Sequence, residues 1–209
     1  NILNQDRVDK VIKTKSSTLE EIGLSSYLEM KKIKVVDTNI GDFICNVFEE
    51  RPYNTKSSAI HKSTEQVAEM YSYKFELKEN CNAKQLTNYT KNILKKEISE
   101  AKALITGANF LVSNTGTIVL TENEGNILKS SSYSPIHIIV AGIDKLITSM
   151  EELGVLLPLS SLYDVNKNIA SLYSFINSPL NRDDNNQKLY LILLNNNRTE
   201  LLSKDKQRS

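Results

Sequence analysis

The chain has 209 residues, of which 40% are hydrophobic and 24% charged, proportions that exclude a disordered protein. Its 26 basic and 25 acidic residues give a net charge of +1, so charge offers no reason to expect nucleic acid or an anionic membrane as the main partner. No apolar run approaches the roughly 18 residues of a membrane span, and no signal peptide is evident. We therefore expect a cytoplasmic protein, and the first residue, Asn1, indicates a fragment.

Two cysteines, Cys45 and Cys81, form no CxxC pair. An iron–sulfur cluster needs about four thiolates, so this chain is not expected to hold one alone. We expect no metal or cofactor in this chain and read the cysteines as two incidental thiols.

The first segments alternate a strand with a helix. Residues 8–13 are predicted to form a strand, and apolar residues between 19 and 28 recur at helical spacing after a capping box of Ser17 and Glu20. Lys13 and Lys15 are two apart, which places both side chains on one face of an extended segment. Together with Ser16 and the free N–H groups of the helix start predicted at Ser17, they form a candidate site for a carboxylate or a phosphate, with two solvated lysines as the alternative.

Three further elements are predicted before residue 83. A strand is expected at 33–36, an amphipathic helix at 37–49 and a strand at 56–60. His61 then precedes a second capping box, Ser63 to Gln66, and a helix to about residue 73. A histidine at such a junction is a candidate proton carrier or ligand, or it caps and packs. Residues 83–101 have the period of a long amphipathic helix.

Two short apolar runs, 110–112 and 118–120, flank a turn at 113–116 and predict adjacent strands. Polar residues cluster at the ends of these runs, where α/β sheets usually place ligands. A hairpin with ordinary polar turns is the alternative. The candidate site residues of this stretch are Asn109, Thr115, Gly116, Glu122, Glu124 and Asn126.

The second half continues the alternation. Residues 127–134 are expected to be a polar connection, 136–142 a strand buried on both faces, and 143–153 a helix ended by Gly154. Residues 159–176 are weakly helical, and 188–194 form the last strand. The order predicts one α/β domain with an open, mostly parallel sheet flanked by helices. No common cofactor fingerprint is present.

Several segments, in order, resemble the LUD domain of the lactate-utilisation protein B family, iron–sulfur proteins of bacterial L-lactate oxidation. They cover nearly the whole chain. The most specific combination is that of residues 105–109, 114–120 and 122–126. The segments are Lys13-Thr14-Lys15-Ser16 with Glu20-Glu21-Ile22-Gly23-Leu24, Val35-Val36-Asp37-Thr38, Ala59-Ile60-His61-Lys62, Ile105-Thr106-Gly107-Ala108-Asn109, Asn114-Thr115-Gly116-Thr117-Ile118-Val119-Leu120, Glu122-Asn123-Glu124-Gly125-Asn126, Pro135-Ile136-His137-Ile138, Gly142-Ile143-Asp144-Lys145 and Leu193-Leu194-Asn195-Asn196-Asn197-Arg198.

The resemblance implies a fold similar to the NagB/RpiA/CoA-transferase group and a single LUD domain over residues 1–209, cut from a longer protein. It implies that the intact protein carries iron–sulfur clusters on a cysteine-rich segment and works with partner subunits to oxidise L-lactate to pyruvate. Two places depart from the family. Its DNGR motif reads Asn195-Asn196-Asn197-Arg198, and a Gly-rich segment expected near residue 170 is absent.

Two functions stay open. In the first, the domain is a ligand site of a redox complex, and Glu122 or Glu124 acts as acid–base or orienting group. Lys13, Lys15, Ser16 and His61 would then contact a small carboxylate or a nucleotide, with Asn109, Thr115, Gly116 and Asn126 around it. In the second, the domain is a non-catalytic scaffold that docks other lactate-utilisation subunits or a second copy, and its Gly and Asn residues only shape turns.

Overall fold

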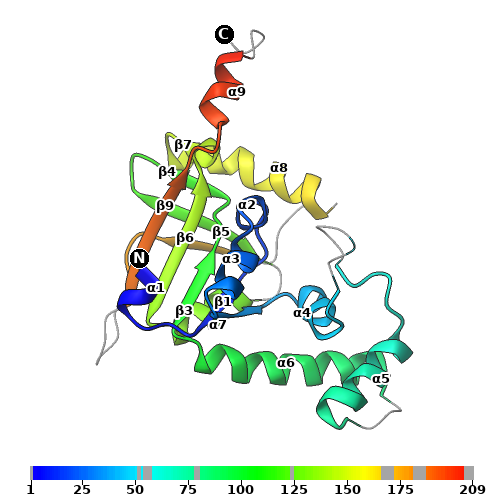
Figure 1. The fold of residues 1–209 in the computed structure, drawn as a ribbon. Helices are drawn as coiled ribbons and strands as arrows, with labels where there is room; N and C mark the ends of the chain where they lie inside the picture. The colour runs from blue at the N-terminus through cyan, green and yellow to red at the C-terminus, as the bar shows by residue number, and fades with distance from the viewer. Residues whose placement is uncertain are drawn as a thin grey trace.

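A five-stranded parallel sheet forms the centre of the fold, in the order β2-β1-β3-β6-β9 (Figure 1). In this computed structural model, residues 2–50, 53, 58–77, 81–122, 125–165, 172–180 and 187–204 are described. All four neighbouring pairs run parallel. The strands are β1 (Lys10–Lys13), β2 (Lys34–Asp37), β3 (Ala103–Thr106), β6 (Ile136–Gly142) and β9 (Lys188–Leu194).

The expected strand at 136–142 is confirmed as β6, and all seven of its residues are buried. It lies between β3 and β9, so both its edges are paired and its faces are covered by other elements. The last expected strand, 188–194, is confirmed with the same bounds as β9. The predicted class, a mostly parallel α/β sheet flanked by helices, is confirmed.

A second, four-stranded sheet has the order β7-β4-β5-β8. Its strands β4 (Phe110–Val112) and β5 (Thr117–Glu122) are adjacent, as expected, and pair antiparallel with Leu111 opposite Ile118. β8 (Leu172–Ile176) pairs with β5 antiparallel, and β7 (Leu146–Ile147) pairs with β4 parallel. Leu111 and Ile118 pack against Ile139 of β6, which joins the two sheets through a shared core.

Helices cover both faces of the parallel sheet. Alternate residues of β1 face opposite sides: Val11 packs toward α1–α3, whereas Ile12 packs toward α6. The predicted capping box of Ser63 and Gln66 is confirmed at the start of α5. The helices are α1 (Ile2–Gln5), α2 (Ser17–Glu21), α3 (Leu24–Met30), α4 (Ile40–Val47), α5 (Thr64–Phe75), α6 (Ala83–Glu100), α7 (Asn126–Tyr133), α8 (Leu153–Val165) and α9 (Arg198–Lys204), with 3₁₀ turns η1 (Ile143–Lys145) and η2 (Met150–Glu152).

The helix expected around residues 19–28 is split into α2 and α3. Gly23 lies between them with φ of 61°, a left-handed conformation that favours glycine. The capping box predicted from Ser17 and Glu20 is wrong, since the N-cap is Ser16 and its side chain makes no capping bond. Glu20 instead accepts a hydrogen bond from Lys13 Nζ at 2.7 Å.

Four other expectations are wrong. Residues 58–60, assigned to a strand at 56–60, form a turn, and residues 56 and 57 lie outside the described chain. The polar connection at 127–134 is helix α7. The helix expected at 143–153 is instead η1, β7 and η2, and α8 begins at Leu153 with Gly154 inside it. The weakly helical stretch ends in strand β8.

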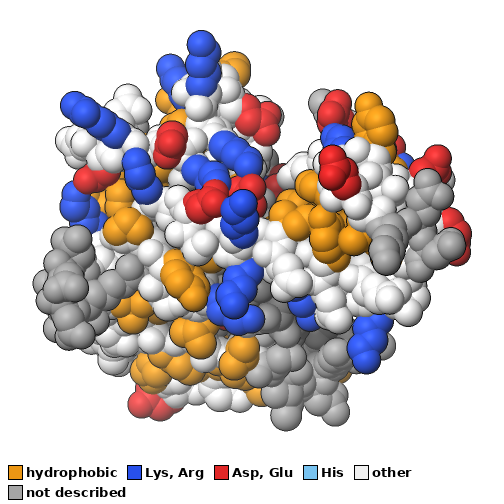
Figure 2. All heavy atoms as spheres, turned by 90° about the horizontal axis from the view of Figure 1, so that it is seen from below, with side chains coloured by type: hydrophobic (Ala, Val, Ile, Leu, Met, Phe, Trp, Pro, Cys, Tyr) orange, Lys and Arg blue, Asp and Glu red, His pale blue; other side chains and the backbone are white. Residues whose placement is uncertain are grey.

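The amino ends of the parallel strands carry a mixed-charge surface. Lys10 contacts Glu97 at 2.9 Å and Glu100 at 2.6 Å, and Lys34 contacts Glu97 at 3.0 Å. Seen from below, basic and acidic side chains intermix with scattered apolar ones (Figure 2). Because these charges pair with one another, this edge presents no single-signed field to a ligand.

Candidate functional site

The carboxyl ends of β1 and β3 lie side by side and open into a cavity of about 380 Å³. Lys13 is in register with Ile105, and Thr14 N donates to Ile105 O at 3.0 Å just beyond the end of β1. This edge of a parallel sheet is where α/β proteins bind ligands, and the volume is that of a small-molecule site. The lining residues are Thr14, Lys15, Ser16, Ser17, Thr18, Gly107, Ala108, Asn109, Phe110, Leu120, Thr121, Ile127, Lys145 and Ser160.

Gly107 lets the two loops approach closely. A Cβ at position 107 would lie 2.9 Å from Ser16 Cβ, closer than real Cβ atoms come, so one loop would have to shift. The glycine therefore serves the contact between the segment after β1 and the segment after β3, which together form one wall of the cavity.

Lys15 supplies one cation to the cavity. Its Nζ donates to Ser58 Oγ at 2.6 Å and to Asp42 Oδ1 at 3.2 Å, and Ser58 also bonds Asp42. Asp42 is 8% exposed and Ser58 2% exposed. Since an ammonium group has three N–H donors, these two buried partners orient Lys15 and leave one donor for a ligand.

Lys145 supplies a second cation from the other side. It lies in η1, directly after β6, and its Nζ is 3.4 Å from Asp144 Oδ2. Burial alone would raise the pKa of Asp144, but the hydrogen bond from Arg198 and the charge of Lys145 hold that pKa below its usual value. Asp144 therefore stays ionised beside Lys145 and keeps it paired.

Lys13 does not line the cavity. It is buried, and its Nζ contacts Glu20 at 2.7 Å and Asp37 at 3.0 Å. Burial lowers the pKa of Lys13, but Asp37 and Glu20 outweigh it and hold that pKa above the usual value. Asp37 is fixed in turn by Asn46 Nδ2 at 2.7 Å. Lys13 thus forms structural ion pairs with Glu20 and Asp37. Of the two predicted lysines, only Lys15 lines the cavity.

Asn109 and Glu122 make backbone contacts around β5. Asn109 lines the cavity, and its Oδ1 accepts from Thr121 N at 2.8 Å. Glu122 does not line the cavity; it accepts from Ile127 N at 2.7 Å and Leu128 N at 3.2 Å, so its carboxylate caps α7.

Three more predicted site residues lie elsewhere. Thr115 and Gly116 are in the exposed hairpin turn, where Gly116 has φ of 67° and Thr115 bonds Thr117 at 2.7 Å. His61 lies 3.0 Å from Glu50. None of the three lines the cavity.

Two predicted residues fall outside what can be placed. Glu124 lies outside the described residues, and Asn126 starts α7 but its side chain is likewise not described. The structure thus brings together Lys15, Ser16 and Asn109 of the predicted set.

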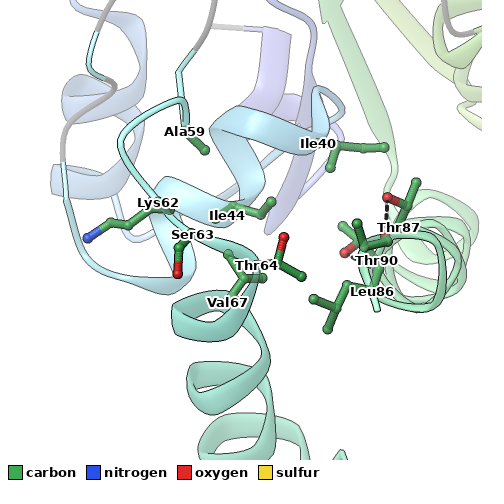
Figure 3. Close-up of a pocket in the computed structure, with 11 residues that line it drawn as sticks. Ile40, Ile44, Ala59, Lys62, Ser63, Thr64, Val67, Leu86, Thr87 and Thr90 are labelled. Atoms are coloured by element: carbon green, nitrogen blue, oxygen red, sulfur yellow. Dashed lines mark hydrogen bonds between the residues drawn. The ribbon is translucent and has the colours of Figure 1, made fainter. Parts of the chain in front are cut away.

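A smaller hollow of about 150 Å³ lies between α4, α5 and α6 (Figure 3). Its walls are mostly apolar side chains and threonine hydroxyls. Lys62 points away from the hollow in this view, and its Nζ contacts Glu50 at 2.6 Å. Lys62 therefore directs no charge into the hollow, which is a weaker candidate for an anionic ligand than the larger cavity.

The sequence interpretation missed one charged lining residue, Lys145, and the two buried partners of Lys15. Lys145 follows the buried strand 136–142, so the same strand-end rule could have identified it. Asp42 and Ser58 lie far from Lys15 in the chain, and no local pattern links them.

Within the described residues, no group of three or more His, Cys, Asp or Glu side chains is placed to hold a metal ion. Nor does any described helix combine the length and apolar character of a membrane span.

Comparison with known proteins connects this fold to one family. The model of the LUD domain matches residues 2–192. Lactate utilization protein B of Bacillus cytotoxicus is 29% identical over 206 residues, which are 98% of this chain and 43% of that protein. Lactate utilization protein B of Bacillus pumilus is 30% identical over 203 residues, 96% of this chain and 43% of that protein. The chain therefore spans less than half the length of these relatives.

Among solved structures, a DUF162 family protein from Deinococcus radiodurans is similar to part of the chain. It is 22% identical with a TM-score of 0.34, covering 47% of this chain and 57% of that one.

Proposed function

Because the chain belongs to the LUD domain family, we propose that it serves lactate utilisation by binding a small carboxylate, L-lactate or pyruvate, at the ends of β1 and β3. One observation carries this proposal. The cavity there combines the ammonium groups of Lys15 and Lys145 with hydroxyl and amide side chains. A 2-hydroxy or 2-oxo acid needs such a set: a cation for its carboxylate and a hydrogen-bonding group for its second oxygen.

The lining suggests binding and orientation rather than proton removal. Among the residues that the structure describes, which exclude Glu124, those that line the cavity include no carboxylate and no histidine. Asn109 and Thr18 supply neutral groups that can orient a hydroxyl or carbonyl oxygen, whereas Glu122 is occupied in capping α7. We propose that the domain holds the acid and that the proton acceptor is provided elsewhere in a complex with partner subunits.

Oxidation of L-lactate to pyruvate removes two electrons, which the family resemblance assigns to iron–sulfur clusters. The two cysteines of this chain do not fit a cluster, because one cluster needs about four thiolates. Cys45 is buried and donates to Ser58 O at 3.3 Å, and burial raises the pKa of its thiol, which disfavours the thiolate. No electron-transfer step is therefore assigned to residues of this chain.

The proposal is tested by calorimetric titration of the chain with L-lactate, pyruvate, inorganic phosphate and adenine nucleotides. We expect a carboxylate to bind and Lys15→Ala to weaken it about tenfold, because one charge-assisted hydrogen bond is lost. Lys95→Ala, an exposed lysine on α6, is the matched control. Binding of neither acid, or equal affinity in Lys15→Ala, would rule out this site.

A docking module is the second candidate function, and the surface around β9 favours it. Leu191 and Leu193 of β9 are 44% and 48% exposed, and β9 ends the order of the described parallel sheet. An apolar edge strand exposes backbone groups that another chain can pair with. Under this function, Leu191→Lys with Leu193→Lys abolishes capture of partner subunits in a pull-down while pyruvate affinity is unchanged. Size-exclusion chromatography of the chain alone distinguishes docking of partner subunits from self-association.

A further inference from the structure

Arg198 joins three strand ends at the carboxyl edge of the parallel sheet. Its guanidinium bonds Glu21 through two nitrogens, Nη2 at 2.8 Å and Nη1 at 3.1 Å, and its Nε bonds Asp144. Glu21 ends α2, which follows β1, and Asp144 lies in η1, which follows β6. Arg198 itself starts α9, which follows β9 and projects from the body of the fold (Figure 1).

The backbone on both sides is shaped for this contact. Asn196 and Asn197 have φ of 38° and 66°, and this left-handed turn after β9 brings Arg198 to the edge. Gly142, the last residue of β6, leaves room for the side chain. A Cβ at position 142 would lie 2.6 Å from Arg198 Nε and 3.0 Å from its Cζ. The side chain of Arg198 is only 18% exposed, so the guanidinium is packed as well as paired.

We infer that Arg198 is a positioning residue for the carboxylate site, an inference that rests on the function proposed above. Arg198 and its two partners are not among the lining residues, but each partner lies on a segment whose other residues line the cavity. Glu21 is on the helix whose first residues, Ser17 and Thr18, line one wall. Asp144 precedes and pairs with Lys145, which lines the other.

The planar guanidinium of Arg198, bonded to both Glu21 and Asp144, therefore fixes the distance between the two walls of the cavity. An arginine bonds two carboxylates through a planar, rigid group with fixed donor directions, whereas a lysine presents a point charge on a flexible stem. With Arg198 in place, Asp144 is held and Lys145 is directed at the cavity. Without it, Asp144 and Glu21 lose the guanidinium that they share, and the repulsion between these two carboxylates separates the walls although Lys145 still neighbours Asp144.

The first test is a double-mutant cycle read by calorimetric titration with pyruvate. Arg198→Ala is expected to weaken pyruvate binding about tenfold, the effect of losing one charge-assisted hydrogen bond from Lys145. In a Lys145→Ala background the same change should cost less than about twofold, because the arginine acts through that lysine. Lys188→Ala is the control, since it breaks an ion pair with Asp6 at the other end of β9.

A second variant moves the guanidinium without removing it. Gly142→Ala is expected to weaken pyruvate binding as Arg198→Ala does, because the new methyl group displaces the side-chain ends of Arg198 and Asp144. The backbone at 142 has φ of −69°, so alanine itself causes no strain. Combined with Arg198→Ala, Gly142→Ala should add no further loss. A purely destabilising role would not produce this dependence on Arg198.

Amide hydrogen exchange tests the inference without a ligand. In Arg198→Ala, exchange should accelerate together in α2 and in η1, and remain unchanged in α6. If wild-type protein binds no pyruvate, the proposed function fails, and the exchange pattern still decides whether Arg198 holds the walls. If Arg198→Ala does not fold, Arg198→Lys replaces it, with an intermediate loss expected.

Two results would overturn the inference. One is wild-type affinity in Arg198→Ala. The other is an exchange increase confined to α9, which would make the arginine only an anchor for that helix.

Discussion

His137 allows a quantitative test of the central sheet. It is fully buried in β6, and its Nε2 lies 3.0 Å from Thr106 Oγ1, while Nδ1 has no hydrogen-bond partner among the described residues. Burial lowers the pKa of His137 from 6.5 to about 4, because a charged imidazole would be desolvated there. The unfolded chain therefore takes up a proton as the pH falls through about 6.5, and the folded protein does so only near 4.

The sign follows from this difference. Between about pH 6.5 and 4 the unfolded state binds more protons, so the free energy of unfolding falls as the pH falls. The pKa of His137 falls from 6.5 to about 4, and at about 1.4 kcal/mol per pH unit the full effect on the free energy of unfolding is about 3 kcal/mol. About 2 kcal/mol of this is lost between pH 7.5 and pH 5.

Urea unfolding of wild type and His137→Gln at several pH values measures the effect. The wild type should lose about 2 kcal/mol more than His137→Gln over that interval. His61→Gln is the control, since the chain has two histidines and His61 is the more exposed one. An imidazole NMR titration of His137 with a midpoint at 6 or above, or equal pH slopes in wild type and His137→Gln, would refute the reasoning.

Four further substitutions test local roles. Gly107→Ala should destabilise the protein by about 1–3 kcal/mol and abolish pyruvate binding in calorimetry, since its Cβ would meet Ser16. Gly154→Ala, in open space within α8, should instead stabilise by about 0.5–1 kcal/mol in urea unfolding. Glu122→Ala should lower the free energy of unfolding by about 1 kcal/mol through loss of the α7 cap, and it should leave pyruvate affinity unchanged. A loss of pyruvate affinity at unchanged stability would instead make Glu122 a catalytic candidate again. Ser63→Ala should cost about 1 kcal/mol in the same unfolding assay, and no change would contradict its capping role.

The elements that the sequence predicts correctly are those whose signal is local. β6 and β9 are runs of apolar residues, and α5 begins with a capping box, so each is specified by its own residues. The helix expected at 143–153 failed because its apolar spacing is compatible with a helix, whereas Leu146 and Ile147 pair with β4. That pairing lies more than 30 positions away in the chain, beyond any local pattern.

Helix α7 was missed for a related reason. It contains few apolar residues, and its buried side chains include Ser130 and Ser131, which in sequence indicate a loop. Its N-terminus is capped by Glu122 from the end of β5, so the signal that starts the helix lies before the glycine turn at Gly125. Tertiary contacts therefore decide its conformation.

The candidate site divides in the same way. Of the predicted site residues, Ser16 and Asn109 line the cavity, because parallel strands share a carboxyl edge and both residues follow such strands. The strand-end rule could not separate Lys15 from Lys13, since both lie at the carboxyl end of the same strand. What separates them is the set of carboxylates contributed by other elements: Asp37 and Glu20 retain Lys13, and Asp42 holds Lys15 at the cavity.

The charges at this edge also favour one class of ligand. Each described cation near the cavity has a carboxylate partner: Lys13 with Asp37, Lys15 with Asp42, Lys145 with Asp144 and Arg198 with Glu21. The local field is therefore close to neutral, and a polyphosphate would bring several charges that these pairs do not offset. A monocarboxylate adds one charge and can share an ammonium that already has an aspartate behind it. Recognition then depends on the positions of Lys15 and Lys145 rather than on net charge, which is why the distance between the two walls matters.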